Sequence, residues 1–239
     1  GPEAVGVYSI GYKLGSLALV IIFAFNLGWQ PFYIKIGNNK NASDTFGKIG
    51  TIFLRSLISI WGLIVFWIPR FMQIRIGDNH LIGEEFWASE QIVSLIFLSY
   101  LFYAGYIVLM PSIYLLEKQN WAPIFRGSGA IINISLNLLF IKYWGLLGAA
   151  LATLVAYFGM FIIIYYKSNQ WLKIACNWRS IGLHLIITAT FILFFEMTEK
   201  SLFISIGFTF IYLGLLLFFQ GKTKLLNDFN YLKSSFSDA

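Results

Sequence analysis

Three cationic residues, Lys13, Arg55 and Arg126, lie within or at the start of long apolar stretches of the sequence. A charge inside a membrane helix is costly and usually faces the interior of a helix bundle or a water-filled cavity. A lysine there can meet a phosphate as a point charge, and a guanidinium can bind one through two hydrogen bonds. Alternatively, Lys13 and Arg55 extend to the nearest membrane surface, and Arg126 simply belongs to the excess of cations on the cytoplasmic side.

Two pairs of amide side chains repeat one spacing, Asn26 with Gln30 and Asn133 with Asn137. Residues four apart share one face of a helix, so each pair presents its amides in the same direction. Such amides suit the hydroxyl groups of a sugar in a cavity. They also suit hydrogen bonds between neighbouring helices, which is the more ordinary arrangement in a membrane. The four residues are therefore candidates for a substrate cavity, with helix packing as the alternative.

The same stretches also contain small residues at regular spacing and prolines. Small residues four apart let a neighbouring helix approach closely. Residues of this kind are Gly11, Gly15, Gly148, Ala152 and Ala156. Proline inside a helix bends its axis, so Pro31 and Pro111 are candidate hinges, with a fixed kink as the alternative.

All of these residues belong to seven long apolar stretches. Hydrophobic residues make up 58% of the 239-residue chain and charged residues 12%, whereas charged residues approach about a quarter of a soluble domain. The stretch 92–116 carries no charge, and about 20 apolar residues suffice for a helix to cross a membrane. The sequence therefore predicts an all-α, polytopic transmembrane bundle with helices at 5–35, 51–68, 92–116, 122–141, 146–166, 180–195 and 202–219.

Basic residues concentrate in alternate connections between these stretches. Twelve of the 17 Lys and Arg residues lie at one set of ends, four lie at the other, and Lys13 lies within the first stretch. Because Lys and Arg favour the cytoplasmic side of a membrane, the tail 221–239 is expected in the cytoplasm and Gly1 in the periplasm. An outer N-terminus without an export signal predicts that further spans precede Gly1. We therefore expect 1–220 to be a C-terminal transmembrane lobe whose N-terminal lobe is missing from this fragment.

The sequence contains little that could support catalysis or metal binding. Cys176 is the only cysteine, and the two histidines, His80 and His184, lie far apart. The apolar stretches contain no nucleotide-binding loop, catalytic triad or carboxylate pair. We therefore expect no enzyme activity, no metal and no other cofactor. The net charge of +6 fits cytoplasmic loops that face anionic lipids, so nucleic acid is not expected as a partner.

Several segments of the chain resemble one family of membrane transporters. They are Gly-Val-Tyr-Ser-Ile-Gly-Tyr-Lys at 6–13, Ala-Phe-Asn-Leu-Gly-Trp-Gln-Pro-Phe at 24–32, Gly-Glu-Glu-Phe at 83–86, and the segment 129–152. They are similar to the second lobe of bacterial polysaccharide flippases (Wzx-type), within the superfamily of multidrug, oligosaccharidyl-lipid and polysaccharide exporters. The resemblance covers nearly the whole chain, and its motifs consist mainly of glycine, aromatic and apolar residues.

The resemblance implies a protein of two lobes around a central cationic cavity, of which this chain would be the second lobe. It implies that a polyprenyl-pyrophosphate-linked oligosaccharide is flipped across the bacterial inner membrane by alternating access, for O-antigen, capsule or another surface polysaccharide. The implied partners are this lipid-linked substrate, membrane lipids, the N-terminal lobe, a polysaccharide polymerase and a chain-length regulator.

Three other functions compete with that of a flippase. A cation-coupled drug exporter of the same superfamily needs an acidic cation site, yet none of the 11 Asp and Glu residues lies centrally in a predicted span. An intramembrane polysaccharide polymerase or acyltransferase needs positioned catalytic groups. The one longer outer connection, 69–91, has His80 and several acids in no recognisable arrangement. A purely structural membrane scaffold would not need polar and cationic residues within its spans.

Overall fold

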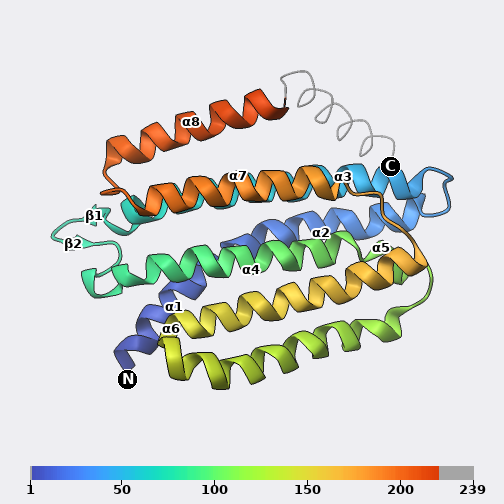
Figure 1. Ribbon diagram of the computed structural model, residues 1–239, viewed down its shortest axis with the longest axis horizontal. Coiled ribbons are helices and arrows are strands. Elements are labelled where there is room, and N and C mark those ends of the chain that lie inside the picture. The colour runs from blue at the N-terminus through green and yellow to red at the C-terminus, as the bar shows by residue number, and fades with distance from the viewer. Residues whose placement is uncertain (1, 221–239) are drawn as a thin grey trace.

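The computed structural model is almost entirely helical (Figure 1), which confirms the helical fold predicted from the sequence. It describes residues 2–220, with side chains described for residues 3–217, so the tail 221–239 lies outside the described residues. In chain order the elements are α1 (Pro2–Gly15), α2 (Leu17–Ile36), α3 (Ala42–Met72), β1 (Arg75–Ile76), β2 (Asn79–His80), the 3₁₀ helix η1 (Glu84–Ser89), α4 (Glu90–Val108), α5 (Pro111–Tyr114), the 3₁₀ helix η2 (Gln119–Trp121), α6 (Ala122–Trp171), α7 (Trp178–Glu196) and α8 (Leu202–Gln220).

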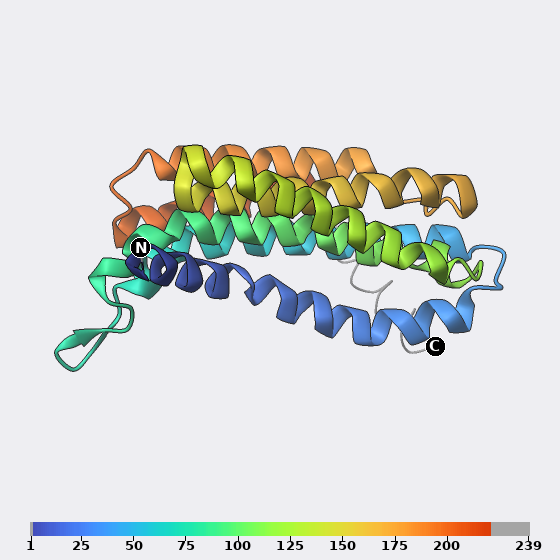
Figure 2. The ribbon, with the colours of Figure 1, turned by 90° about the horizontal axis from the view of Figure 1, so that it is seen from below.

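The long helices lie side by side and run between two ends of the bundle (Figures 1 and 2). One end carries the antiparallel β1–β2 pair, the start of α1 and the connection from α7 to α8, and we call it the β end. The opposite end carries η2 and the connections from α2 to α3 and from α6 to α7, and we call it the η2 end. Helix α4 contacts α1, α2, α3 and α6, so it forms the centre around which the other helices pack.

Helix α6 is folded back on itself at Gly145 (Figure 1). This residue has φ 54° and ψ −127°, a backbone conformation that residues with a side chain rarely adopt. The first arm, 122–144, and the second arm, 146–171, run in opposite directions, and Asn133 Nδ2 donates across them to Thr153 Oγ1 at 3.3 Å. The reversal lies at the short turn between the predicted stretches 122–141 and 146–166.

Within the described residues, five helical segments are long and apolar enough to cross a membrane: Glu3–Ile36, Ala42–Met72, Glu84–Tyr114, Gln119–Trp171 and Trp178–Glu196. Helix α8 adds a shorter apolar segment, Leu202–Leu217. Because Gln119–Trp171 contains both arms of α6, the helices correspond in order to the apolar stretches of the sequence. Their length and composition are compatible with a membrane location.

Helix α3 begins at Ala42, earlier than the start near residue 51 that the sequence predicts. Its first turns are amphipathic, with Phe46 buried and both Asp44 and Lys48 exposed. A search for uninterrupted apolar residues misses such a start, because polar residues occupy one face of the helix. As a result, Arg55 lies well inside α3 and not one turn from its beginning.

Short interruptions divide the first and third predicted stretches. The first is split at Ser16 into α1 and α2. In the third, α4 ends at Val108 and α5 begins at Pro111. Pro31 lies inside α2 without ending it. The two candidate hinges therefore differ, because Pro111 follows a break in the helix and Pro31 belongs to a continuous one.

The two glycines of α1 lie directly against α4. A Cβ atom added at Gly11 would lie 2.8 Å from Ile92 Cβ, and one added at Gly15 would lie 2.7 Å from Ile96 Cβ. Side chains do not tolerate such separations, so α1 and α4 approach this closely because neither position carries a side chain.

Small residues also lie where the two arms of α6 meet. A Cβ atom added at Gly148 would lie 2.2 Å from the carbonyl oxygen of Phe140. Ala152 and Ala156 are buried, and the Ala156 carbonyl lies beside Gly129 of the first arm. These contacts hold the two arms close together, so that Asn133 of the first arm reaches Thr153 of the second.

Candidate substrate groove

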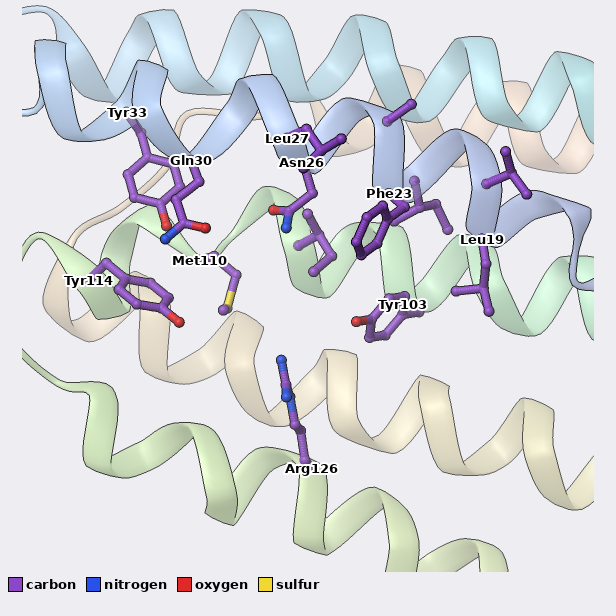
Figure 3. A pocket seen from close by; sticks show the side chains of 14 residues that line it. Leu19, Phe23, Asn26, Leu27, Gln30, Tyr33, Tyr103, Met110, Tyr114 and Arg126 are labelled. Carbon is purple, nitrogen blue, oxygen red and sulfur yellow. The ribbon is translucent and has the colours of Figure 1, made fainter.

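Two adjoining cavities lie against α4. The first, of about 730 Å³, lies between α2, α4, α5 and the first arm of α6 (Figure 3). The second, of about 600 Å³, lies between α1, α4 and both arms of α6. Leu19, Tyr103 and Arg126 line both cavities. The cavities therefore join at these residues into one groove, whose first cavity extends toward the η2 end and whose second extends toward the β end.

Arg126 projects from the first arm of α6 into this junction (Figure 3). Among the described side chains, it is the only charged one that lines either cavity. Its guanidinium lies close to the phenol groups of Tyr106, Tyr103 and Tyr114 on α4 and α5. A guanidinium presents five N–H donors in a planar fork, so this position suits a phosphate or pyrophosphate.

Amide groups lie in both cavities. Asn26 and Gln30 line the first cavity, into which they point from α2 (Figure 3). Asn133 and Asn137 line the second cavity, where Asn137 Nδ2 donates to Asn133 Oδ1 at 2.9 Å. Because Asn133 also bonds to Thr153, it ties the arms of α6 together while it borders the cavity. The packing role and the cavity role that the sequence left open thus coincide at this residue.

A continuous series of tyrosine rings, which we call the tyrosine row, passes along the second cavity. Neighbouring rings in the row have centroids 5.5 to 6.4 Å apart, and the order of the rings is Tyr8, Tyr12, Tyr100, Tyr157, Tyr103 and Tyr106. The hydroxyl groups of Tyr12 and Tyr100 lie 2.8 Å apart. Tyr100 and Tyr106 are buried, whereas the other four rings line the second cavity. The cavity wall is therefore aromatic over much of its length and carries hydroxyl groups.

The tyrosine row was not identified from the sequence, although its spacing carried a signal. Tyr8 and Tyr12 are four residues apart, and Tyr100, Tyr103 and Tyr106 follow each other at three. Both spacings place side chains on a shared helix face. Tyrosines at such positions also occur at membrane surfaces, so spacing alone does not distinguish a cavity wall from an interfacial anchor.

Two of the cationic candidates lie away from the groove. Lys13 is exposed on α1 and lines neither cavity. Arg55 is buried in α3, with 7% of its surface exposed, and interacts electrostatically with His184 of α7. His184 Nε2 in turn lies 2.9 Å from Ser59 Oγ. The structure separates these two cations from the candidates that line the groove, which are Asn26, Gln30, Arg126, Asn133 and Asn137.

A cluster of charges joins several helices at the β end. Lys200 Nζ lies 2.6 Å from Glu90 Oε1 of α4 and 2.6 Å from Glu196 Oε2 of α7. The side chain of Arg70 in α3 donates to the Lys200 carbonyl. Burial alone would lower the pKa of Lys200, but its hydrogen bonds to the two carboxylates outweigh burial and raise this pKa above the ordinary 10.5. Each of these charges has a partner, which indicates a structural cluster and not a substrate site.

Comparisons with known proteins supply no function, because no family model, no curated protein and no solved structure matches the chain. Within the described part of the chain, no three His, Cys, Asp or Glu residues lie together as metal ligands would.

Proposed function

We propose that the chain is one transmembrane lobe of a flippase that moves a polyprenyl-pyrophosphate-linked oligosaccharide across the bacterial inner membrane. The observation that carries this proposal is the position of Arg126 at the junction of two cavities lined by amides and phenols. Such a groove offers a binding group for a phosphate beside groups suited to sugar hydroxyls. The product would feed the assembly of a surface polysaccharide such as O-antigen or capsule, in which a polymerase and a chain-length regulator act next.

The surface beside the groove supports a membrane location. Large apolar side chains are exposed in and beside the groove: Val20, Phe23 and Leu27 on α2 also line the first cavity, and Ile131 and Ile134 on the first arm of α6 lie outside both cavities. Exposed apolar patches of this kind are unusual in water and normal against lipid or another membrane helix. A second apolar lobe lying across both flanks would close the groove into a central cavity, as alternating access requires.

The distribution of basic residues supports one orientation of this lobe. Lys35, Lys40, Lys118, Lys167 and Lys173 lie in or beside the connections at the η2 end. Because Lys and Arg favour the cytoplasmic side, we infer that the η2 end is cytoplasmic and the β end periplasmic. The first cavity then extends toward the cytoplasm and the second toward the periplasm.

The groove favours a flippase over the competing functions. Among the described residues, no Asp or Glu lines either cavity, so the groove offers no carboxylate to a coupling cation of a drug exporter. His80 is the candidate catalytic residue for a polymerase or acyltransferase. It pairs with Glu84 at 3.3 Å and lines neither cavity.

Replacement of Arg126 tests this proposal. The substrate is the lipid-linked saccharide extracted from cells of the native host that lack the protein, and its transport is measured with the intact protein in liposomes. A hydrogen bond to a charged group contributes about 1.5–3 kcal/mol, so Arg126→Gln is expected to lower transport by at least about tenfold. Arg126→Lys keeps the charge without the planar fork and is expected to be intermediate.

Lys13→Gln is the matched control, because it removes a cation that lies outside the groove. It is expected to transport at nearly the wild-type rate. The proposal is wrong if the wild-type protein does not transport the extracted lipid, or if Arg126→Gln transports as well as Lys13→Gln.

A further inference from the structure

Aromatic and polar side chains border the second cavity together. Four rings of the tyrosine row, Tyr8, Tyr12, Tyr103 and Tyr157, line it from α1, α4 and the second arm of α6. The polar groups Asn133, Asn137 and Thr153 line it from the two arms of α6. Aromatic faces and hydrogen-bonding groups therefore border the same space of about 600 Å³.

Its polar groups are held in a fixed arrangement. Asn137 donates to Asn133, Asn133 donates to Thr153, and Thr153 donates to the Ala149 carbonyl at 3.1 Å. Tyr8 interacts with Thr153, which links α1 to the same set of groups. Groups oriented in this way are preorganised for a ligand, because they lose little freedom when the ligand binds.

The rings are fixed as well. Tyr157 lies 5.5 Å from Tyr100 and 5.6 Å from Tyr103, measured between ring centroids. Tyr100 is buried behind the cavity wall and bonds to Tyr12. Tyrosine presents an apolar face with a polar hydroxyl at its edge. A pyranose ring has the complementary pattern, with C–H groups on its faces and hydroxyl groups at its rim.

We propose that the second cavity is a saccharide-binding subsite, in which Tyr12, Tyr103 and Tyr157 contact the faces of sugar rings and Asn133, Asn137 and Thr153 hydrogen-bond their hydroxyl groups. This inference rests on the proposed function and assigns different parts of the substrate to different parts of the groove. Arg126 binds the pyrophosphate at the junction, and the sugars extend from there toward the β end. The protein then recognises the glycan separately from the lipid pyrophosphate.

Binding measurements with two lipids test this division. The probes are polyprenyl pyrophosphate and the lipid-linked saccharide extracted from native-host cells that lack the protein, each titrated against the intact protein in detergent. The variants are Tyr157→Leu and Asn137→Leu, with Tyr166→Leu as the control because Tyr166 is exposed on the same helix and lines neither cavity. Each of the first two is expected to weaken binding of the lipid-linked saccharide about tenfold, the equivalent of one hydrogen bond or ring contact.

Both variants are expected to bind polyprenyl pyrophosphate within about twofold of wild type, well short of a tenfold loss, which would correspond to about 1.4 kcal/mol. Binding of this probe also shows that the variants are folded. Arg126→Gln should weaken binding of both probes. The subsite is ruled out if wild type binds the two probes equally, or if Tyr157→Leu and Asn137→Leu weaken both probes alike or neither. Failure of wild type to bind either probe, or equal binding by Arg126→Gln, contradicts the flippase proposal itself.

Discussion

At the scale of single residues, Arg126 and Cys176 have opposite surroundings. Arg126 is exposed to the groove, whereas Cys176 is buried in the connection between α6 and α7. Burial raises the pKa of the Cys176 thiol to about 12, although a hydrogen bond with Thr51 acts in the opposite direction. The thiolate is the reactive form of cysteine, so this thiol is almost wholly protonated and unreactive at neutral pH.

We expect a maleimide at pH 7.5 to label Cys176 at least about 100-fold more slowly than a cysteine introduced by Lys40→Cys, because few thiolates form and access is blocked. Denaturation in sodium dodecyl sulfate should remove the difference. Lys40 is exposed in the connection between α2 and α3, so the reference cysteine keeps an ordinary environment. Equal labelling of the two thiols in the native protein would contradict the buried position.

Residue types alone identified part of the groove. Charge and amide spacing led to Arg126, Asn26, Gln30, Asn133 and Asn137, which all line it. The same reasoning led to Lys13 and Arg55, which do not. The sequence does not fix how each helix is rotated about its own axis, and that rotation decides which side chains face the groove. A helix in lipid is apolar on most faces, so its sequence pattern does not show which face meets which neighbour.

At the scale of helices, the contact between α1 and α4 depends on glycine. Gly15→Val is expected to lower the free energy of unfolding by about 1–3 kcal/mol, because the added carbons overlap Ile96 and force the helices apart. The measurement is the midpoint of thermal unfolding of the purified protein in detergent. Gly28→Val is the control, because an added Cβ at Gly28 meets no atom within 4 Å. Equal destabilisation by both changes would show that the loss comes from the valine residue and not from the contact.

Helix boundaries were predicted well at the reversal of α6 and for α7 and α8, and less well in the first three stretches. The reversal of α6 lies at Gly145, inside the short polar turn that separated two apolar stretches. The start of α3 was predicted too late, because its first turns alternate buried and exposed residues. The break at Ser16 between α1 and α2 was not predicted, because the apolar character continues across it.

At the scale of the whole molecule, Lys200 joins elements that are distant in the sequence. It pairs with Glu90 of α4 and Glu196 of α7, and Arg70 of α3 bonds to its carbonyl. Removal of the lysine would leave two carboxylates facing each other at the end of the bundle. Such partly buried clusters are costly to break, since the remaining charges lose their partner.

We expect Lys200→Met to lower the free energy of unfolding by about 1–3 kcal/mol at pH 7, a value between those of exposed and buried ion pairs. The pKa of Lys200 is higher in the folded protein than in the unfolded chain. The cluster therefore stabilises the fold fully below about pH 10.5, and this stabilisation is lost as the pH rises through the pKa of Lys200 in the folded protein. Thermal unfolding in detergent between pH 6 and pH 10 should therefore show a constant difference from wild type. Lys142→Met, at an exposed position of the same end, should unfold like wild type.

The reversal at Gly145 has a consequence for how the protein is made. Asn133 and Thr153, which it brings together, are 20 residues apart along the chain. A pair so close in sequence can bond as soon as the second arm of α6 leaves the ribosome, before α7 and α8 have emerged from it. In the proposed membrane setting, the polar wall of the second cavity would thus enter the lipid with Asn133 and Thr153 already bonded to each other, as a ready-made unit around which the later helices assemble.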